Sequence, residues 1–163
     1  MIDFSKYNVL DILSQAPPAV YIDRIVSFDN ISKQLVAEKY INEDEYLLQG
    51  HFPDNPVVPA IFTIEALSQA CHLCGFAIGE SDPNIPHISK KSEHLTIKVN
   101  IRFKNKTNSK DTLLLHARLI EVVNMVSIFK VKAINKANHK TVATGEIMGI
   151  ARIINGEAEN QTE

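Results

Sequence analysis

Two side chains in residues 50–69 are of types that exchange protons. His51 stands in the run His51-Phe52-Pro53, and Glu65 follows fourteen residues later in a mainly apolar stretch. An imidazole titrates near neutral pH and can act as a base, whereas a carboxyl group among apolar side chains can stay protonated and act as an acid. Taken singly, His51 is more simply a loop residue and Glu65 a paired core acid. Their pairing within a proline-rich frame favours general acid–base chemistry.

The stretch that carries Glu65 is predicted to be a long buried helix. Pro53, Pro56 and Pro59 disfavour a helix up to that point, because proline lacks an amide donor and biases the residue before it toward extended geometry. Residues 60–78 contain no proline and are apolar on nearly every face, and Gly79 is placed to end the helix. At 1.5 Å per residue the helix is about 28 Å long. Four polar side chains interrupt it, so we do not expect it to cross a membrane.

The rest of the chain alternates apolar and polar residues with the period of a strand. We expect a short helix and then strands, the first two forming a hairpin and the last four a meander. The expected ranges are 5–14 for the helix and 19–28, 33–41, 95–103, 112–123, 125–135 and 141–154 for the strands. This is an α+β fold in which a curved antiparallel sheet wraps the central helix. A sheet covers one side of a helix, so a second copy of the chain is expected on the other.

Composition narrows the class of protein. The 163 residues, 45% of them apolar and 22% charged, suit one domain over 1–154, followed by a flexible acidic tail over 155–163. A net charge of -2 gives no case for nucleic-acid binding, and the absence of a basic-then-apolar N-terminal segment indicates the cytoplasm.

Cys71 and Cys74 are predicted to be reduced core thiols, and no metal site is expected, since a closed zinc site needs four ligands. Four further histidines are predicted at the surface or in turns: His87, His94, His116 and His139.

The motif around His51 resembles the signature of a known enzyme family. His51-Phe52-Pro53, the prolines at 56 and 59, and the segment Glu65–Ala70 look like the motif of the β-hydroxyacyl-(acyl carrier protein) dehydratases of the FabZ type. Residues 20–25 and 100–103 also resemble family segments, so the likeness covers about residues 8–152. The resemblance implies a hotdog fold and dehydration of (3R)-hydroxyacyl thioesters on acyl carrier protein to trans-2-enoyl thioesters, in fatty-acid or related lipid or polyketide biosynthesis.

The resemblance also implies a role for each motif residue. His51 is the catalytic histidine, Glu65 of the other subunit is its acidic partner, and the amide of Ala60, after Pro59, polarises the thioester carbonyl. No cofactor is implied, and the enzyme is a homodimer, with assembly into a trimer of dimers left open. The chemistry suits these types: a base removes the C2 proton, an acid protonates the departing C3 hydroxyl, and amides at a helix N-terminus stabilise enolate charge.

Other residues are candidates for supporting roles, each with a simpler alternative. Gln69 lies one turn past Glu65 and either orients it or is a helix-packing amide. Phe62 either lines the acyl tunnel or belongs to the core, and the same holds for Tyr21. A basic region in this mildly acidic chain is either a carrier-protein contact or a solvated strand end. Its candidate contact residues are Lys90, Lys91, Arg102 and Lys104.

Two positions depart from the family pattern and keep other functions open. Ala60 and Asp54 stand where the family has glycine. If position 60 required a positive φ, alanine would cost about 1 kcal/mol, and its methyl group could also obstruct the thioester. Two alternatives therefore stand beside the dehydratase: a hotdog acyl-thioester hydrolase, and a catalytically silent acyl-binding module.

Overall fold

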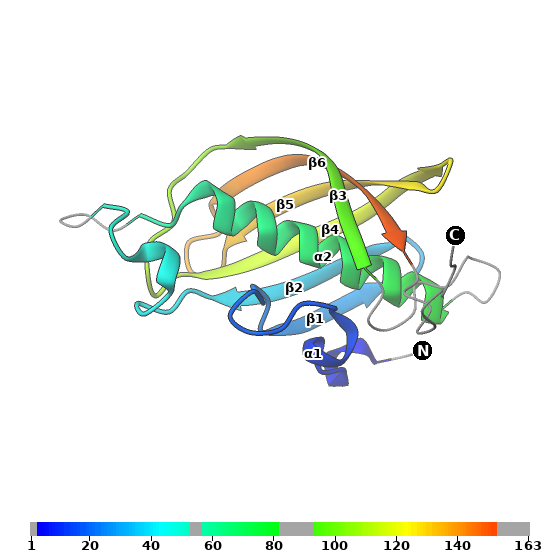
Figure 1. Cartoon of the computed structure of the whole chain (residues 1–163), viewed down its shortest axis with the longest axis horizontal. Coiled ribbons are helices and arrows are strands. Elements are labelled where there is room, and N and C mark those ends of the chain that lie inside the picture. The colour runs from blue at the N-terminus through cyan, green and yellow to red at the C-terminus, as the bar shows by residue number, and fades with distance from the viewer. Residues whose placement is uncertain (1–2, 53–56, 82–92, 153–163) are drawn as a thin grey trace, which may run out of the picture.

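One long helix, α2 (Ala60–Ser81), lies across the concave face of a curved six-stranded antiparallel sheet (Figure 1). The computed structural model describes residues 3–52, 57–81 and 93–152. The helix begins directly after Pro59, as predicted, but continues past Gly79. Gly79 is buried within the protein, and tertiary packing of this kind overrides the weak helix propensity of a single glycine. The prediction of a central buried helix is confirmed.

The burial of α2 explains its composition. By length and apolar content the helix could cross a bilayer, but 83% of its most apolar window is buried inside the protein. Its side chains form one core with those of the sheet, in which Phe62, Leu67, Leu73 and Phe76 are fully buried. A core helix that is covered on most faces needs no amphipathic pattern.

The sheet has the order β1-β2-β4-β5-β6-β3. Its strands are β1 (Arg24–Asp29), β2 (Gln34–Tyr40), β3 (Glu93–Phe103), β4 (Thr112–Val123), β5 (Val126–Asn135) and β6 (Thr141–Arg152). All neighbouring pairs are antiparallel. The predicted strand segments and the β1–β2 hairpin are confirmed. The predicted four-strand meander is wrong for β3, which pairs with β6 at the edge of the sheet and not with β4.

The link between β3 and β4 explains this error. The Lys104 amide donates to Val142 O at the start of β6, and the Lys110 amide donates to Ile41 O just after β2. The link therefore crosses the end of the sheet, from the β3 edge to the strand beside β2. Alternation along the sequence identifies strands but carries no information about such a crossing.

Cross-strand register separates an inner and an outer face of the sheet. Residues directly opposite each other point to the same side, and successive rows alternate. One inner row runs Leu35, Ala117, Val131, Gly145 and Ile101. The next row, on the outer face, runs Val36, His116, Lys132, Thr144 and Arg102.

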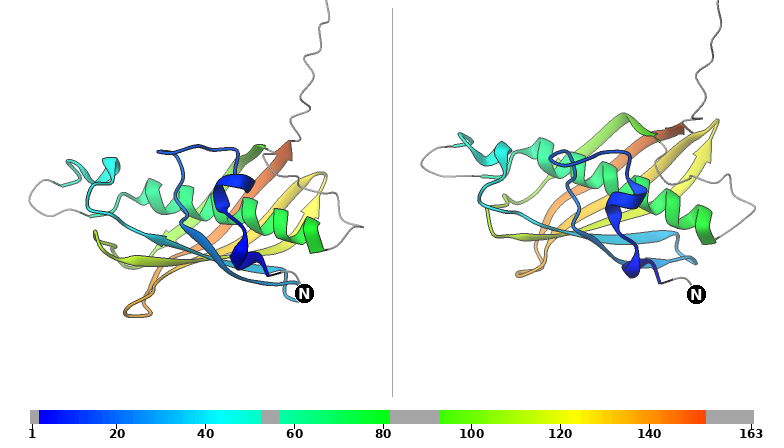
Figure 2. Two further views of the ribbon diagram at one scale, coloured as in Figure 1. Left: turned by 90° about the horizontal axis from the view of Figure 1, so that it is seen from below. Right: turned by 60° about the horizontal axis from the view of Figure 1, so that its bottom comes forward.

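The N-terminal segment passes over α2 (Figure 2), where the ring of Tyr7 meets that of Phe76 edge to face at 5.9 Å. The predicted helix over 5–14 is two short pieces, the 3-10 turn η1 (Phe4–Lys6) and α1 (Val9–Ile12). The break falls at Asn8, whose side chain accepts a hydrogen bond from the amide of Leu10 and so caps α1.

The sequence did not predict that two histidine rings meet at the place where β3 contacts α2. The rings of His94 and His72 stack at 5.7 Å with an interplanar angle of 17°. Burial lowers the pKa of each imidazole to about 4. His94, predicted at the surface, is half-buried because its strand packs on the helix, and His116 is likewise half-buried on β4. His139 lies exposed in the turn between β5 and β6, as predicted, whereas His87 lies outside the described residues.

Candidate active site

His51 is held by hydrogen bonds to backbone groups that precede and follow it in the chain. It follows the 3-10 turn η2 (Tyr46–Leu48), and its amide donates to Leu48 O at 3.2 Å. Its carbonyl accepts from the Val57 amide at 2.8 Å, and its ring Nδ1 lies 2.9 Å from Val57 O. A carbonyl oxygen can only accept, so Nδ1 carries a proton, and in the neutral ring Nε2 then has the free lone pair. The imidazole, stacked on Phe52, is therefore held in the tautomer that can act as a base through Nε2.

Glu65 is oriented by Gln69, one turn along α2. The Gln69 Nε2 donates to Glu65 Oε1 at 2.9 Å and to Ala19 O at 2.8 Å, and its Oε1 accepts from the Tyr21 amide at 2.9 Å. Gln69 is buried, so these bonds fix both the carboxylate and the segment that precedes β1. The contact between Gln69 and Glu65 is the one that the dehydratase resemblance led us to consider. It also explains why β1 begins at Arg24 and not at residue 19, because the Tyr21 amide is engaged with the helix.

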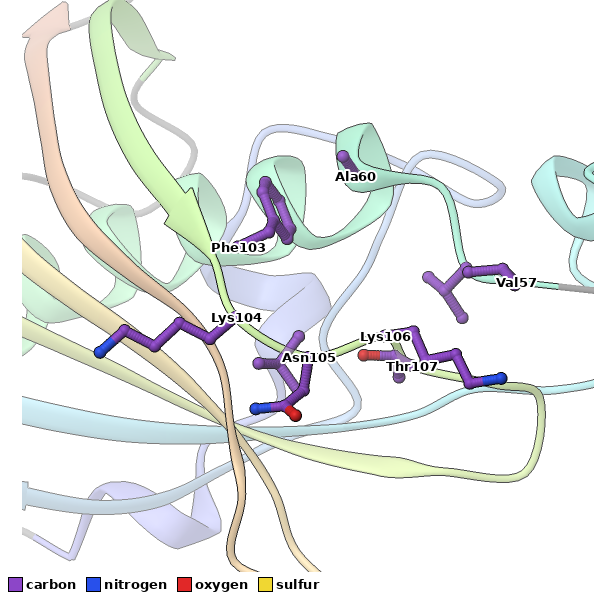
Figure 3. A pocket seen from close by; sticks show the side chains of 9 residues that line it. Val57, Ala60, Phe103, Lys104, Asn105, Lys106 and Thr107 are labelled. Carbon is purple, nitrogen blue, oxygen red and sulfur yellow. The ribbon is translucent and has the colours of Figure 1, made fainter.

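The first turn of α2 borders a pocket of about 330 Å³. The pocket is lined by Val57, Val58, Ala60, Phe103, Lys104, Asn105, Lys106, Thr107 and Val142. Ala60 and Phe103 lie on one side of it, and the side chains of Lys104 and Lys106 extend away in opposite directions (Figure 3). The first amides of a helix have no partner within the helix and carry its positive dipole end. The pocket thus places donors beside a cavity that has an apolar wall.

Alanine at position 60 fits the backbone found there. Ala60 is not among the non-glycine residues with positive φ, so a glycine is not needed for its conformation. The conformational objection to Ala60 is therefore removed. Asp54, the other departure from the family pattern, lies outside the described residues.

Phe62 and Pro59 lie at the same end of the helix. Pro59 O accepts from the Phe62 amide at 3.1 Å, which tightens the first turn. The Phe62 ring is fully buried and meets Tyr21 edge to face at 4.9 Å. In one chain Phe62 is thus a core residue, and its contact with an acyl chain stays a prediction.

The predicted carrier-protein contacts are described only in part. Arg102 lies exposed on the outer face of β3, and Lys104 is exposed directly after that strand. Lys90 and Lys91 lie outside the described residues. The structure therefore brings Lys104, but not Arg102, into the lining of the pocket beside Ala60.

Within one chain the described residues do not bring His51 and Glu65 into a shared hydrogen bond. The ring of His51 bonds to Val57 and the carboxylate of Glu65 bonds to Gln69. Among residues 3–52, 57–81 and 93–152, no three His, Cys, Asp or Glu side chains are grouped so that they could hold a metal ion. Cys71 and Cys74 are buried free thiols, and burial raises the pKa of Cys74 to about 12. These cysteines pack in the core, as predicted.

Sequence comparison decides the family. The FabA-like domain matches residues 13–146, which is most of the chain. The protein belongs to the FabA-like family. Among its relatives, the 3-hydroxyacyl-(acyl-carrier-protein) dehydratase FabZ of Clostridium tetani is 32% identical over 141 residues, covering 86% of this chain and 92% of the relative. The enzyme of the same name from Burkholderia thailandensis is 30% identical over 148 residues, covering 90% and 88%.

Solved structures of other proteins share the hotdog arrangement of this FabA-like chain. The dehydratase heterocomplex ApeI:P of Xenorhabdus doucetiae matches with a TM-score of 0.73 at 13% identity, covering 91% of this chain and 93% of that one. An uncharacterised protein of Pyrococcus horikoshii matches with a TM-score of 0.60 at 13% identity, covering 91% and 92%. At such identities the likeness establishes the fold alone, and the predicted hotdog fold is confirmed.

Proposed function

We propose that this FabA-like protein is a dehydratase that converts (3R)-hydroxyacyl thioesters on acyl carrier protein to trans-2-enoyl thioesters. It serves fatty-acid or related lipid biosynthesis in the cytoplasm. The observation that carries the proposal is the tautomer of His51. With Nδ1–H bound to Val57 O, the ring offers Nε2 as a base. The FabZ relatives at 30–32% identity support the same reaction.

Each step of the reaction can be assigned to a described residue. Nε2 of His51 removes a proton from C2 of the substrate, and the electron pair moves onto the thioester as an enolate. The amide of Ala60, at the positive end of α2, stabilises the charge on the thioester oxygen. The enolate then re-forms the carbonyl as the C3–O bond breaks, and Glu65 donates a proton so that the hydroxyl leaves as water. Gln69 holds Glu65 in place for this transfer.

A second copy of the chain would complete the site. Strand β3 is an edge strand, and four of its apolar side chains are 39–54% exposed: Leu95, Ile97, Val99 and Phe103. An open edge with apolar side chains is suited to strand pairing with an identical partner. Phe52 and Ile61, near the start of α2, are exposed as well. We place His51 of one subunit opposite Glu65 of the partner subunit across this interface.

The outer face of the sheet has the charge expected of a carrier-protein contact. Arg102 and Lys132 belong to one cross-strand row of this face. Arg118 and Lys130 belong to the next row on the same face, where Glu146 also lies. These cations are exposed. An acidic carrier would be steered toward such a surface. The proposed contact comprises Arg102 and Lys104, and Lys90 and Lys91 belong to the same proposal from the sequence.

The test is turnover of a 3-hydroxybutyryl thioester on carrier protein, followed by enoyl absorbance and by free carrier thiol. Wild type should form the enoyl product without thiol release, and His51→Ala should lose at least a hundredfold in rate. Thiol release without enoyl absorbance would identify an acyl-thioester hydrolase. Binding of the acyl carrier without either product, for short and long acyl chains, would identify a silent acyl-binding module.

A further inference from the structure

A lysine occupies a core position in β2. Along this strand Leu35, Ala37 and Lys39 alternate inward, and the first two are fully buried. Lys39 is only 9% exposed. Burial of an ammonium group costs free energy unless the group is paired. The partners of Lys39 therefore indicate the role of this lysine.

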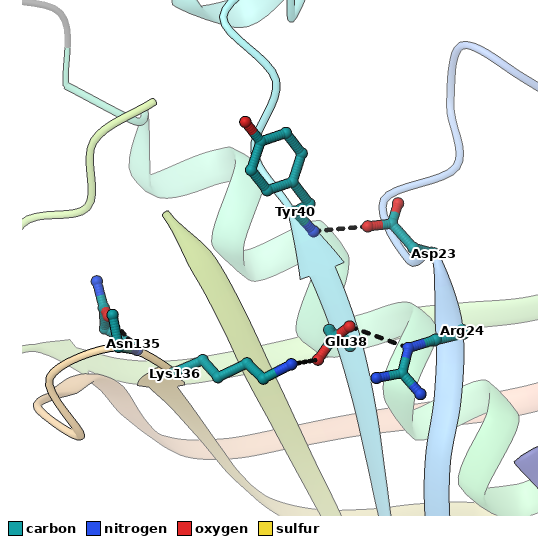
Figure 4. Close-up of polar contacts among 7 residues, drawn as sticks. Asp23, Arg24, Glu38, Tyr40, Asn135 and Lys136 are labelled. Carbon is teal, nitrogen blue, oxygen red and sulfur yellow. Dashed lines mark hydrogen bonds and ion pairs between the residues drawn. The ribbon is translucent and has the colours of Figure 1, made fainter. Parts of the chain in front are cut away.

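Lys39 has three partners from three different segments. Its Nζ lies 2.8 Å from Oε1 of Glu45 and 3.5 Å from Oδ1 of Asp23, and 5.9 Å above the ring of Phe62 on α2. Asp23 is itself fixed, because its Oδ2 accepts from the Tyr40 amide at 2.6 Å (Figure 4). The ammonium therefore joins the end of β2, the first turn of the central helix and the loop that follows β2.

The Glu45 bond leads directly to His51. Glu45 precedes the turn η2, where its side chain makes no capping bond to the backbone, and its carbonyl accepts from the Leu48 amide at 2.8 Å. Leu48 O in turn accepts from the His51 amide. A chain of contacts thus runs from the Lys39 ammonium through Glu45 and the η2 turn to the residue that carries the imidazole.

The same loop provides a contrasting ion pair. Oε2 of Glu43 lies 2.9 Å from Nζ of Lys110, but the side chain of Glu43 is 59% exposed and that of Lys110 is 63% exposed. Solvent-exposed pairs contribute little to stability, whereas removing one partner of a buried pair leaves the other charge uncompensated. The glutamates at 43 and 45 therefore form a natural matched pair for an experiment.

We propose that Lys39 is a positioning residue, whose bond to Glu45 fixes the η2 turn and thereby the place of the His51 imidazole relative to the helix α2. This inference rests on the proposed catalytic role of His51. A loosened turn would leave the enzyme folded and able to bind substrate, but the base would spend less time within reach of the C2 proton.

The experiment compares Glu45→Ala with Glu43→Ala, and Lys39→Met with Lys39→Arg. Turnover of a small 3-hydroxybutyryl thioester is measured well below the unfolding temperature of each variant, together with the imidazole signal of His51 in a proton–carbon correlation spectrum. That signal is assigned by its absence in His51→Ala. Glu45→Ala and Lys39→Met should lose about tenfold in kcat with KM nearly unchanged, and the His51 signal should broaden or split. Glu43→Ala and Lys39→Arg should keep kcat within about threefold and retain one sharp signal.

The outcomes separate this inference from the proposed function. If Glu45→Ala and Lys39→Met lower the unfolding temperature but leave kcat and the His51 signal as in wild type, the pair only stabilises the fold and the inference is wrong. If Glu43→Ala reduces kcat as strongly as Glu45→Ala, the effect belongs to the loop as a whole and the inference is also wrong. Full activity of His51→Ala would instead overturn the proposed function, whatever the other variants do.

Discussion

The side-chain amide of Gln69 donates to the carboxylate of Glu65 at 2.9 Å across one turn of α2. The same amide group also holds Ala19 O and the Tyr21 amide. One buried side chain thus links the proposed acid to the segment that leads into the sheet. The position of Glu65 is therefore set by tertiary contacts as well as by its place on the helix.

Replacing Gln69 by methionine should affect both stability and catalysis. Methionine is similar in size but cannot bond to Ala19 O or to the Tyr21 amide, and the loss of these two hydrogen bonds costs about 1–3 kcal/mol. Loss of the bond to Glu65 should lower kcat by about tenfold. Urea unfolding and turnover measure the two effects. Gln15→Met is the control, since within the described part of the chain the Gln15 side chain accepts a hydrogen bond from the neighbouring Ser14 alone, at 3.5 Å. A loss of similar size in the control would contradict the account.

The stacked pair His72 and His94 should make the protein sensitive to acid. Burial lowers the pKa of each ring from its usual 6.5 to about 4. Between about pH 6.5 and pH 4 these two histidines are protonated in the unfolded chain but neutral in the folded chain. The free energy of unfolding therefore has its full value above about pH 6.5 and falls as the pH is lowered from 6.5 to 4. The expected slope is up to about 1.4 kcal/mol per pH unit for each histidine. Unfolding free energies between pH 4 and 7 measure it.

His94→Asn should remove part of that slope. The matched change His139→Asn, in an exposed turn where asparagine tolerates the positive φ, should leave the slope unchanged. The readout is the dependence of stability on pH, so a cavity that lowers stability equally at every pH does not obscure it. If the free energy of unfolding depends on pH equally in wild type and in His94→Asn, His94 is not a source of the acid sensitivity. Burial also lowers the pKa of His116, which adds to the slope that remains.

The sequence was sufficient for the central helix and for the extent of most strands. Proline spacing set the start of α2 at Ala60, and period-two alternation found β4 at its observed bounds. The position of β3 was not predictable in this way, since its pairing with β6 depends on where the 104–111 link crosses the sheet. Alternation is a local signal, whereas strand order is a property of the whole fold.

The same distinction applies to the site. His51, Glu65 and Gln69 were proposed as site residues from their types, their spacing and the family resemblance, but the Val57 carbonyl that selects the tautomer of His51 is backbone and leaves no signature. Lys39, in contrast, has a recognisable sequence signature. It occupies an inward position in the alternation of residues 33–41, where a charged side chain requires buried partners.

Close approach of β3 and β6 makes Gly145 intolerant of any side chain. A Cβ at Gly145 would lie 2.0 Å from Asn100 O, so the two strands would have to separate. Gly145→Ala should destabilise the protein by about 3 kcal/mol or more. Thermal and urea unfolding measure the loss. Gly149 offers a comparison, because there a Cβ would lie 2.5 Å from the ring of His94, whereas the nearest backbone atom, Leu95 O, is 3.2 Å away.

The two glycines should therefore respond differently to a second change. Truncation by His94→Ala removes the two atoms nearest to a methyl group at position 149, so in a double-mutant cycle Gly149→Ala should cost much less in the His94→Ala background. Gly145→Ala should cost the same with or without His94. If the destabilisations caused by Gly149→Ala and His94→Ala are additive, the ring of His94 does not fill the space beside Gly149.

The exposed apolar edge of β3 should control self-association. Replacing Ile97 and Val99 together by lysine should convert a dimer to a monomer in sedimentation experiments, because it places charges in the proposed strand-pairing edge. Turnover should fall with dissociation. The matched control is the same pair of changes at Ile120 and Val122, which are about as exposed but lie on β4 away from that edge. Dissociation caused by the control and not by the β3 changes would place the interface elsewhere.

The central claim is that His51 of one subunit and Glu65 of the partner subunit act on one substrate, and mixed dimers test it most directly. His51→Ala and Glu65→Gln should each be inactive alone in the enoyl assay with a 3-hydroxybutyryl thioester. After unfolding and refolding together, they should regain about a quarter of wild-type activity, because half of the dimers are mixed and each mixed dimer has one intact site. A refolded mixture that contains mixed dimers but stays as inactive as the single variants, while refolded wild type is active, would contradict the claim.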